Sequence, residues 1–349
     1  MRTELATRPT RPAVSRGATA VLALVLAACN GTSSYMDATG TAGRSEATLG
    51  WWLTAAASAV VLIVCVAILL GMSRHREDAR HGADEGVMRR NEVKSGLNWI
   101  YVGVAITVVV LAISFGGTMV TLNAASHPPI TPSLTMDVTA HQWWWEVTYS
   151  QAGNPELGFT TANEVHLPVG VPVRVRLHSA DVIHSFWLPQ IAGKMDVIPG
   201  QENETWLEAR TPGHSRGMCG EYCGMQHAVM ALDVTAESPA AFQAWAMERR
   251  AGAAAPATPS ASAGRVVFAR TCGACHAVTG TEALGRVGPD LTHIASRSTI
   301  GAGALTNSPE HLARWIRHAP DVKEGARMPE IPLTDAELRD VIAYLETLH

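Results

Sequence analysis

The sequence has little charge and no excess of basic residues. Asp, Glu, Lys and Arg together make up 17% of the 349 residues, and the formal net charge is −4. A nucleic-acid-binding surface needs an excess of positive charge, so this composition argues against a nucleic-acid partner. Hydrophobic residues reach 47%, which excludes the disordered and fibrous classes. At about 150 residues per domain, the length predicts about two folded domains.

Charge is also absent from two long stretches of the chain. Residues 51–72 and 97–122 contain 22 and 26 residues without an Asp, Glu, Lys or Arg. A membrane-spanning helix needs about 20 such residues, so each stretch predicts a transmembrane helix. Several arginines lie between them, and the positive-inside rule places this connection in the cytoplasm. We expect a transmembrane helix hairpin over residues 51–123, with everything that follows on the outer face of the membrane.

The N-terminal end has the pattern of an export signal. Arginines precede an apolar run at residues 18–28, which is too short to span a bilayer and ends in Leu-Ala-Ala before Cys29. These last four residues resemble the cleavage site of bacterial lipoproteins. The resemblance implies a signal peptide at residues 1–28, a lipid on Cys29 and an exported segment at residues 29–50. An ordinary secretory signal followed by an unrelated cysteine is the alternative.

Residues 124–250 change to a β-rich pattern. Val173, Val175 and Leu177 alternate with polar residues, so a strand here would bury one face. Several strands of this kind pack as a sandwich or a barrel. The segment is therefore predicted to be a separate all-β domain.

A linker and a second, helical domain are expected after the β domain. Residues 251–264 are rich in Ala, Pro and Ser, the composition of a flexible linker. Within residues 265–349, Thr334 and Glu337 have the spacing of a capping box at the start of a last helix. The apolar stripe that follows consists of Leu338, Val341, Ile342 and Leu345.

A cluster of soft ligands occupies one short segment of the β domain. Cys219 and Cys223 are followed by His227 and Met230, and His184 lies upstream. Thiolates, imidazoles and a thioether together suit copper, and a second thiolate lets two sulfurs bridge two metal ions. A zinc site and a disulfide are the alternatives, but zinc would leave Met230 without a role.

The helical domain contains the attachment pattern of a c-type haem. Cys272 and Cys275 are spaced to bond the two vinyl groups of a porphyrin, and the adjacent His276 would reach its iron. A thioredoxin-like redox pair is the alternative, but it would leave His276 without a role. Met328, the only methionine in residues 265–349, is the expected second axial ligand. The alternative ligands are His293, His311 and His318.

These motifs resemble those of a known family. His184 and the run at residues 219–230 resemble the dicopper CuA domain of cytochrome c oxidase subunit II, and residues 265–349 resemble a class I cytochrome c. The resemblance implies a two-helix transmembrane hairpin, an all-β cupredoxin-like Greek-key sandwich and an all-α cytochrome c domain. It also implies one dicopper CuA centre and one covalently bound haem c.

The resemblance assigns roles to individual residues. The CuA ligands would be bridging Cys219 and Cys223, with His184, His227, Met230 and the backbone carbonyl of Glu221. The Glu221 side chain would face a magnesium or manganese ion at the catalytic subunit, and a solvated loop carboxylate is the alternative. Trp143, the first Trp of an aromatic segment, would receive the electron from cytochrome c. Packing inside the β domain is the alternative for Trp143.

The function implied is electron transfer in the inner membrane of a bacterium. Electrons from cytochrome c or another periplasmic donor would pass to the haem, to CuA and to catalytic subunit I, which reduces oxygen and pumps protons. No catalytic residue would lie in this chain. The alternatives are the CuA subunit of a nitric oxide reductase and a membrane-anchored electron-transfer or copper-binding module without an enzyme. The family's Trp-Thr-x-x-Pro run and nearby Glu, linked to proton uptake, are absent, and Glu92 is the candidate substitute.

Overall fold

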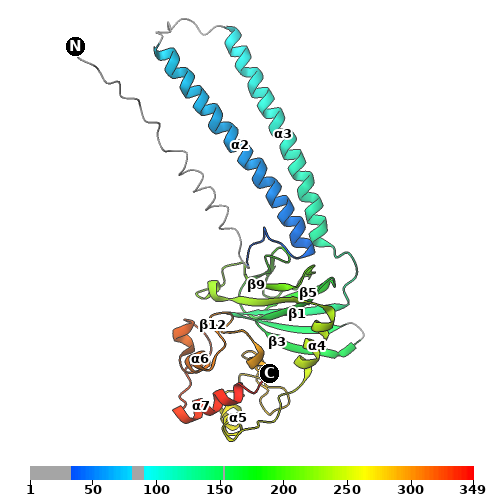
Figure 1. The fold of residues 1–349 in the computed structure, drawn as a ribbon, viewed down its shortest axis with the longest axis vertical. Coiled ribbons are helices and arrows are strands. Elements are labelled where there is room, and N and C mark those ends of the chain that lie inside the picture. Colours follow the sequence, from blue (N-terminus) through cyan, green and yellow to red (C-terminus); the bar gives the residue numbers. More distant parts are fainter. Residues whose placement is uncertain (1–32, 81–89, 152–153) are drawn as a thin grey trace, which may run out of the picture.

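The computed structural model describes residues 33–80, 90–151 and 154–349. The predicted signal peptide and Cys29 lie outside the described residues, as does the side chain of Glu92. Along the chain the structure has a long helix hairpin, a β-sandwich and a helical C-terminal domain (Figure 1). This is the order of parts expected from the sequence.

The hairpin consists of α2 (Thr41–Arg80) and α3 (Arg90–Ser126), which lie side by side and extend from the sandwich (Figure 1). Both helices are long and apolar enough to cross a membrane, over Thr41–Ser73 and Gly96–Ser126. Their apolar side chains are exposed, as expected of helices that contact lipid. At the end that meets the sandwich, α2 begins ten residues before the uncharged stretch, and Ala42 and Ala47 are buried there.

Hydrogen bonds fix the base of the hairpin to the β domain. The Trp206 indole donates to the carbonyl of Ala125, in the last turn of α3, at 2.7 Å. The Thr41 hydroxyl, at the start of α2, donates to Glu208 at 2.9 Å. The membrane helices are therefore held at a defined place on the sandwich.

The sandwich has two five-stranded sheets. The first has the order β3-β2-β1-β5-β8 and the second the order β4-β10-β9-β6-β7. The strands of the first sheet are β1 (Leu134–His141), β2 (Trp144–Gln151), β3 (Asn154–Ala162), β5 (Val173–Ser179) and β8 (Asn203–Leu207). Those of the second are β4 (Glu164–Pro168), β6 (His184–Trp187), β7 (Met195–Val197), β9 (Gly213–Cys219) and β10 (Ala231–Glu237). Two parallel pairs, β1 with β5 and β4 with β10, accompany antiparallel neighbours, and the domain is cupredoxin-like.

The core of the sandwich follows the alternation seen in the sequence. Val173, Val175 and Leu177 of β5 are fully buried, which confirms the predicted buried face. Gly170 has a φ of +73° in the turn that leads into this strand, a conformation that glycine adopts without strain. The all-β prediction misses α4 (Pro239–Arg250), whose Trp245 stacks on His166 at 3.9 Å.

The predicted linker is wrong at its C-terminal end. Helix α5 (Pro259–Thr271) begins inside residues 251–264, with Thr258 as its N-cap and Pro259 in its first turn. A Cβ on Gly264 would lie 1.9 Å from the carbonyl oxygen of Asp340, so this glycine lets α5 pack closely on α7. The alanine and serine residues at this end of the predicted linker are therefore part of a packed helix.

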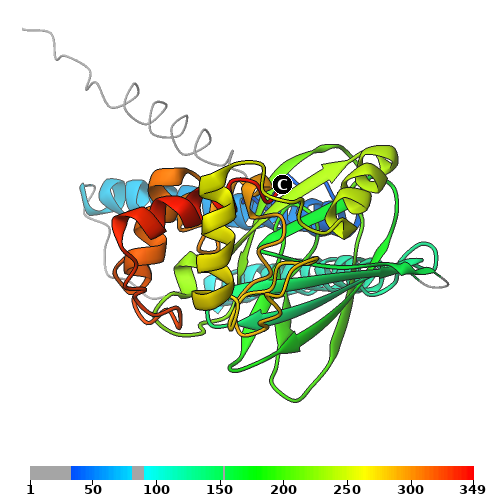
Figure 2. The same cartoon turned by 90° about the horizontal axis from the view of Figure 1, so that it is seen from below.

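The C-terminal domain is built from α5, α6 (Pro309–Val322) and α7 (Asp335–Leu345). This domain also contains the 3-10 helix η2 (Ile294–Ser296) and the short strands β11 (Thr299–Ile300) and β12 (Leu305–Thr306). A further 3-10 helix, η1 (His227–Val229), lies in the β domain between β9 and β10. The predicted capping box of Thr334 and Glu337 is present at the start of α7. Helix α6 kinks at His318, two residues before Pro320. The domain lies beside the sandwich, on the side away from the hairpin (Figures 1 and 2).

Candidate metal and haem sites

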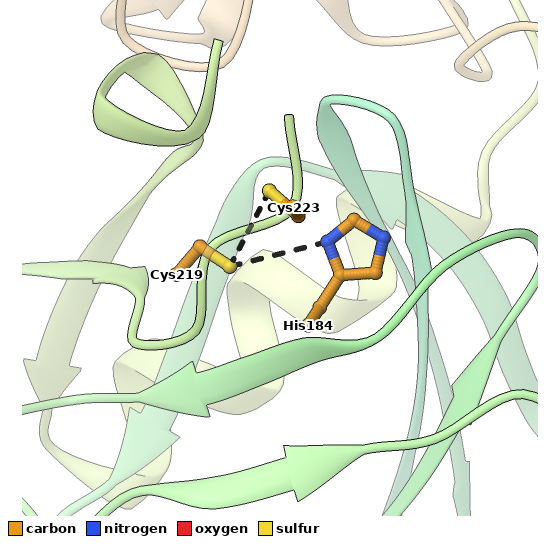
Figure 3. Close-up of side chains that lie close together, drawn as sticks. All are labelled: His184, Cys219 and Cys223. Atoms are coloured by element: carbon orange, nitrogen blue, oxygen red, sulfur yellow. Dashed lines mark hydrogen bonds between the residues drawn. The ribbon is translucent and has the colours of Figure 1, made fainter. Parts of the chain in front are cut away.

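The soft ligands of the β domain meet at one end of the sandwich. His184 begins β6, Cys219 ends β9 and Cys223 lies in the loop that follows (Figure 3). The Cys219 Sγ lies 3.8 Å from the Cys223 Sγ and 3.9 Å from the His184 Nδ1. A disulfide needs a sulfur separation of about 2.05 Å, so the two thiols are unbonded. All three side chains are buried, which excludes water from a metal bound between them.

The remaining predicted copper ligands lie around the same two sulfurs. The His227 Nδ1 is 3.7 Å and the Met230 Sδ 3.9 Å from the Cys223 Sγ. The carbonyl oxygen of Glu221 is 3.2 Å from the Cys219 Sγ. The structure therefore gathers the whole predicted ligand set. Two sulfurs at the centre with further donors on both sides suit two metal ions better than one tetrahedral zinc.

A carboxylate outside the ligand set orients His184. The Asp181 Oδ1 lies 2.9 Å from the His184 Nε2, so Nδ1 is the ring nitrogen left for a metal. Asp181 also accepts hydrogen bonds from the backbone N–H of Gln142 and of Val182, at 2.7 and 2.8 Å. The hydrogen bond from Cys223 lowers the pKa of the Cys219 thiol well below its usual value, and His184 adds to this effect. The sulfur is thereby prepared to bind metal as a thiolate.

The side chain of Glu221 is exposed and lies outside this cluster of ligands. Within the described part of the chain, no group of three His, Cys, Asp or Glu ligand atoms includes its carboxylate. The predicted magnesium or manganese role of Glu221 therefore stays a prediction about an interface with another subunit.

The predicted haem ligands line a large cavity whose wall is formed mostly by the C-terminal domain and, on one side, by the sandwich. Cys272, Cys275 and His276 lie in its wall, and Met328 lies there too. The His276 Nδ1 is 2.8 Å from the carbonyl oxygen of Pro289, which leaves Nε2 for an iron. Burial lowers the pKa of His276, so the ring is neutral, the form that binds metal. Apolar wall residues include Phe268, Leu291, Ile300, Leu312, Ile316 and Val341.

The three alternative axial ligands do not line the cavity. Both ring nitrogens of His293 lie within hydrogen-bonding distance of backbone carbonyls, Nδ1 of His349 at 2.5 Å and Nε2 of Arg249 at 3.0 Å. The His311 Nδ1 lies 2.9 Å from the Thr306 hydroxyl. His318 is exposed. The geometry therefore favours Met328.

Trp143 lies between the two sites. It lies in the turn between β1 and β2, where it is 7% exposed. Its Nε1 donates to the carbonyl of Cys223 at 3.0 Å, and Gln142 donates to the same carbonyl at 2.8 Å. Trp143 also lines the cavity that holds His276 and Met328. One indole thus touches the copper ligand loop and borders the haem cavity.

Comparison with known proteins gives two family matches along the chain. Residues 153–237 match the family described as cytochrome c oxidase subunit II, periplasmic domain, and residues 261–349 match the cytochrome c family. The cytochrome c oxidase subunit 2 of Alkalihalophilus pseudofirmus is 35% identical over 255 residues, which cover 72% of each chain.

The chain belongs to the cytochrome c oxidase subunit II family. A second relative, from Bacillus sp. (strain PS3), is 32% identical over 229 residues that cover 62% of each chain. A solved periplasmic domain of subunit II (CoxB) of Bradyrhizobium japonicum is 32% identical, covering 35% of this chain and 96% of that one with a TM-score of 0.32. This subunit II chain carries a cytochrome c domain behind its periplasmic domain, and these two families imply copper and haem respectively.

The subunit II motifs alone do not reveal the residues that support the ligands. Asp181 carries a weak signal, since it precedes His184 by three residues. Arg297 is buried in the cavity wall, donates to the carbonyl of Asp290 at 2.7 Å and has no motif around it. Lys323 bonds backbone carbonyls from three separate segments, so only the folded chain reveals its role.

Proposed function

We propose that this chain receives electrons for an oxygen-reducing haem-copper oxidase and carries a haem c and a dicopper CuA centre in series. The observation that supports this most is the position of Trp143, which hydrogen-bonds the copper ligand loop and lines the haem cavity. Two one-electron sites joined by one aromatic residue suit transfer between them and argue against a protein that only stores copper.

At the copper site, the protein would supply a rigid and dry ligand cage. Cys219 and Cys223 would supply thiolates to the two coppers, and His184, His227, Met230 and the Glu221 carbonyl would be the other ligands. A dicopper centre takes up and releases one electron at a time. Asp181 holds the His184 ring in one orientation. Burial of His184, Cys219, Cys223 and Met230 in the sandwich limits rearrangement between the two redox states.

At the haem site, the protein would bind the cofactor covalently and through both axial positions. The thiols of Cys272 and Cys275 would form thioethers, and His276 and Met328 would ligate the iron, which exchanges single electrons. A thioether ligand favours reduced iron and so raises the potential. Arg297 is a buried cation in the cavity wall that would neutralise a haem propionate.

The route proposed runs from an external donor to the haem, through Trp143 to CuA, and on to catalytic subunit I. The hairpin would anchor the chain in the bacterial inner membrane with both cofactor domains on the periplasmic face, and a lipid on Cys29 would add to this anchor. Exposed Glu221 would meet a magnesium or manganese ion at the catalytic subunit. Proton uptake near Glu92 belongs to the same proposal.

Turnover of the purified complex tests this function. A tagged chain should copurify with a catalytic subunit and support oxygen consumption from reduced cytochrome c, and Cys223→Ser should abolish that activity. Consumption of nitric oxide but not oxygen would make the partner a nitric oxide reductase. Recovery of the chain with both cofactors but without any catalytic subunit would reduce it to an electron-transfer module.

A further inference from the structure

One loop of the haem domain presses against the copper domain. This loop, residues 323–328, begins at Lys323, directly after α6, and ends at Met328 in the haem cavity. The side-chain amide of Gln226, next to a predicted copper ligand, donates to the carbonyl of Glu324 at 3.0 Å. The segment that provides the predicted axial ligand is therefore also part of the domain interface.

The same loop reaches the residue that orients His184. The guanidinium of Arg327 lies 3.7 Å from the Asp181 Oδ2. Because Arg327 is 67% exposed, this ion pair is screened by solvent and contributes little by itself. Its position nevertheless shows that the residue before Met328 lies beside the support of the copper site.

Lys323 makes the strongest contacts of the loop. The residue is 3% exposed, and its ammonium donates three hydrogen bonds to backbone carbonyls. The acceptors are Trp143 at 2.7 Å, Val229 at 2.7 Å and Gly301 at 2.8 Å. Trp143 and Val229 belong to the copper domain, whereas Gly301 belongs to the haem domain. All three donors of the ammonium are thus used, two of them across the boundary between the two domains.

Burial of the Lys323 charge is unfavourable, and lysine is the residue type whose donors match the three carbonyls around it. Burial lowers the pKa of Lys323 to about 7. The sequence has 24 arginines and three lysines, yet a lysine occupies this buried position. An ammonium presents three donors around a point charge and matches three converging carbonyls, whereas a planar guanidinium would not. Without the ammonium the three carbonyls would lose these donors, and a buried carbonyl that stays unpaired destabilises the docked arrangement.

Gly325 brings the loop into direct contact with Trp143. Its φ is +80°, and a Cβ there would lie 2.7 Å from the Met225 Cε and 3.1 Å from the Trp143 Cη2. The three atoms nearest to this position belong to Met225 and Trp143 of the copper domain. The close approach is therefore a property of the interface and not of the haem domain's own core.

We propose that Lys323 is a positioning residue that locks the haem domain onto the copper domain, so that the haem becomes the sole donor to Trp143. The proposal rests on the proposed function for the direction of electron flow. The docked loop leaves Trp143 only 7% exposed, which denies a soluble donor direct access to it. The contacts of Lys323 thus hold the haem, which is the internal donor, in place, and they also keep a soluble donor away from Trp143.

Rapid mixing of the purified full chain, holding both cofactors, with reduced soluble cytochrome c tests the lock. We expect Lys323→Met to slow haem-to-copper transfer at least tenfold. The same variant should gain at least tenfold in direct copper reduction by the soluble donor. Copper absorption should stay as in the wild type, whereas the haem potential is measured separately because Lys323 also lines the haem cavity. Hydrogen exchange over residues 323–328 should rise, which reports undocking independently of electron transfer.

A second variant separates docking from folding. Gly325→Asn keeps every donor of Lys323, and Asn tolerates a positive φ better than most residues. Its side chain would push against Trp143 and Met225 across the interface, so the same opposite changes in the two rates are expected. Arg314→Met, which removes an exposed cation from α6, the helix that leads into Lys323, is the matched control and should change neither rate.

The outcomes distinguish the lock from the function on which it rests. Wild-type rates in both Lys323→Met and Gly325→Asn would overturn the lock, and so would slower internal transfer without a gain in external copper reduction. If Lys323→Met alters the haem potential, the two electron-transfer rates of Gly325→Asn decide whether docking of the loop controls them. A wild-type chain that transfers no electron from haem to copper would overturn the proposed function, while hydrogen exchange would still show whether Lys323 docks the domain.

Discussion

In the copper site the two cysteine sulfurs and the ring nitrogens beside them already lie 3.7 to 3.9 Å apart, inside the closed sandwich. The predicted haem ligands instead line a large cavity around which the C-terminal domain is built. Cys219, Cys223 and Met230 belong to the continuous core of the sandwich. In the helical domain, core residues such as Leu312 and Val341 are themselves cavity walls.

This difference predicts two kinds of dependence on the cofactor. A sandwich with its own core holds a small metal site without needing the metal to fold. A small helical domain whose core surrounds a cavity needs the cofactor to fill that core, because unfilled apolar volume destabilises a protein. The copper site should therefore be removable without unfolding, whereas removal of haem attachment should unfold its domain.

The largest effect is expected from loss of haem attachment. Replacing Cys272 and Cys275 by Ala should unfold the helical domain, since the loss of core packing exceeds the roughly 5 kcal/mol by which small domains are stable. The sandwich should still bind copper. Circular dichroism and copper titration of the double variant measure both results. A helical domain that stays folded without haem would contradict the expectation that only this domain needs its cofactor to fold.

Removal of one bridging sulfur should have the next largest effect. Cys223→Ser leaves both coppers undercoordinated, so the dicopper site should be lost, with copper affinity reduced by a factor on the order of 1,000 or more. The unfolding temperature of the metal-free chain should change little. Metal analysis and calorimetry test this, and unfolding of the apo sandwich would show that its core depends on the ligands.

Exchange of the predicted axial ligand should change the haem potential without releasing the haem. Met328→His should lower the reduction potential by on the order of 0.1 V, because imidazole stabilises reduced iron less than a thioether does. Redox titration followed by haem absorbance measures the shift. Should the potential stay unchanged, a residue other than Met328 is the ligand.

The smallest effect is expected from the support of His184. Asp181→Asn removes the carboxylate that fixes the ring, and such changes reduce metal affinity by roughly 10–100-fold. Competition titration with a copper chelator measures the loss, with Asp196→Asn on the exposed part of β7 as the matched control. Equal affinities in the two variants would mean that packing alone orients His184.

The sequence predicts which residues gather at the candidate sites but not what surrounds them. Cys219, Cys223, His227 and Met230 are close in the chain, so their spacing already indicates one site, and the β alternation at Val173 places it in a sandwich. The β domain's helix α4 and the early start of α5 were missed because Ala-rich and Pro-rich stretches suit both helices and linkers. The role of Lys323 was hidden because its partners are carbonyls, which every residue has.

The most direct test of the account is the cofactor content of the intact chain purified from an oxidising compartment. Elemental analysis combined with haem absorbance should give two coppers for each covalently bound haem, since two thiolates bridge one metal pair and one Cys-x-x-Cys-His motif holds one haem. One copper per haem, or zinc in place of copper, would contradict the dicopper site and with it the proposed path from haem to CuA.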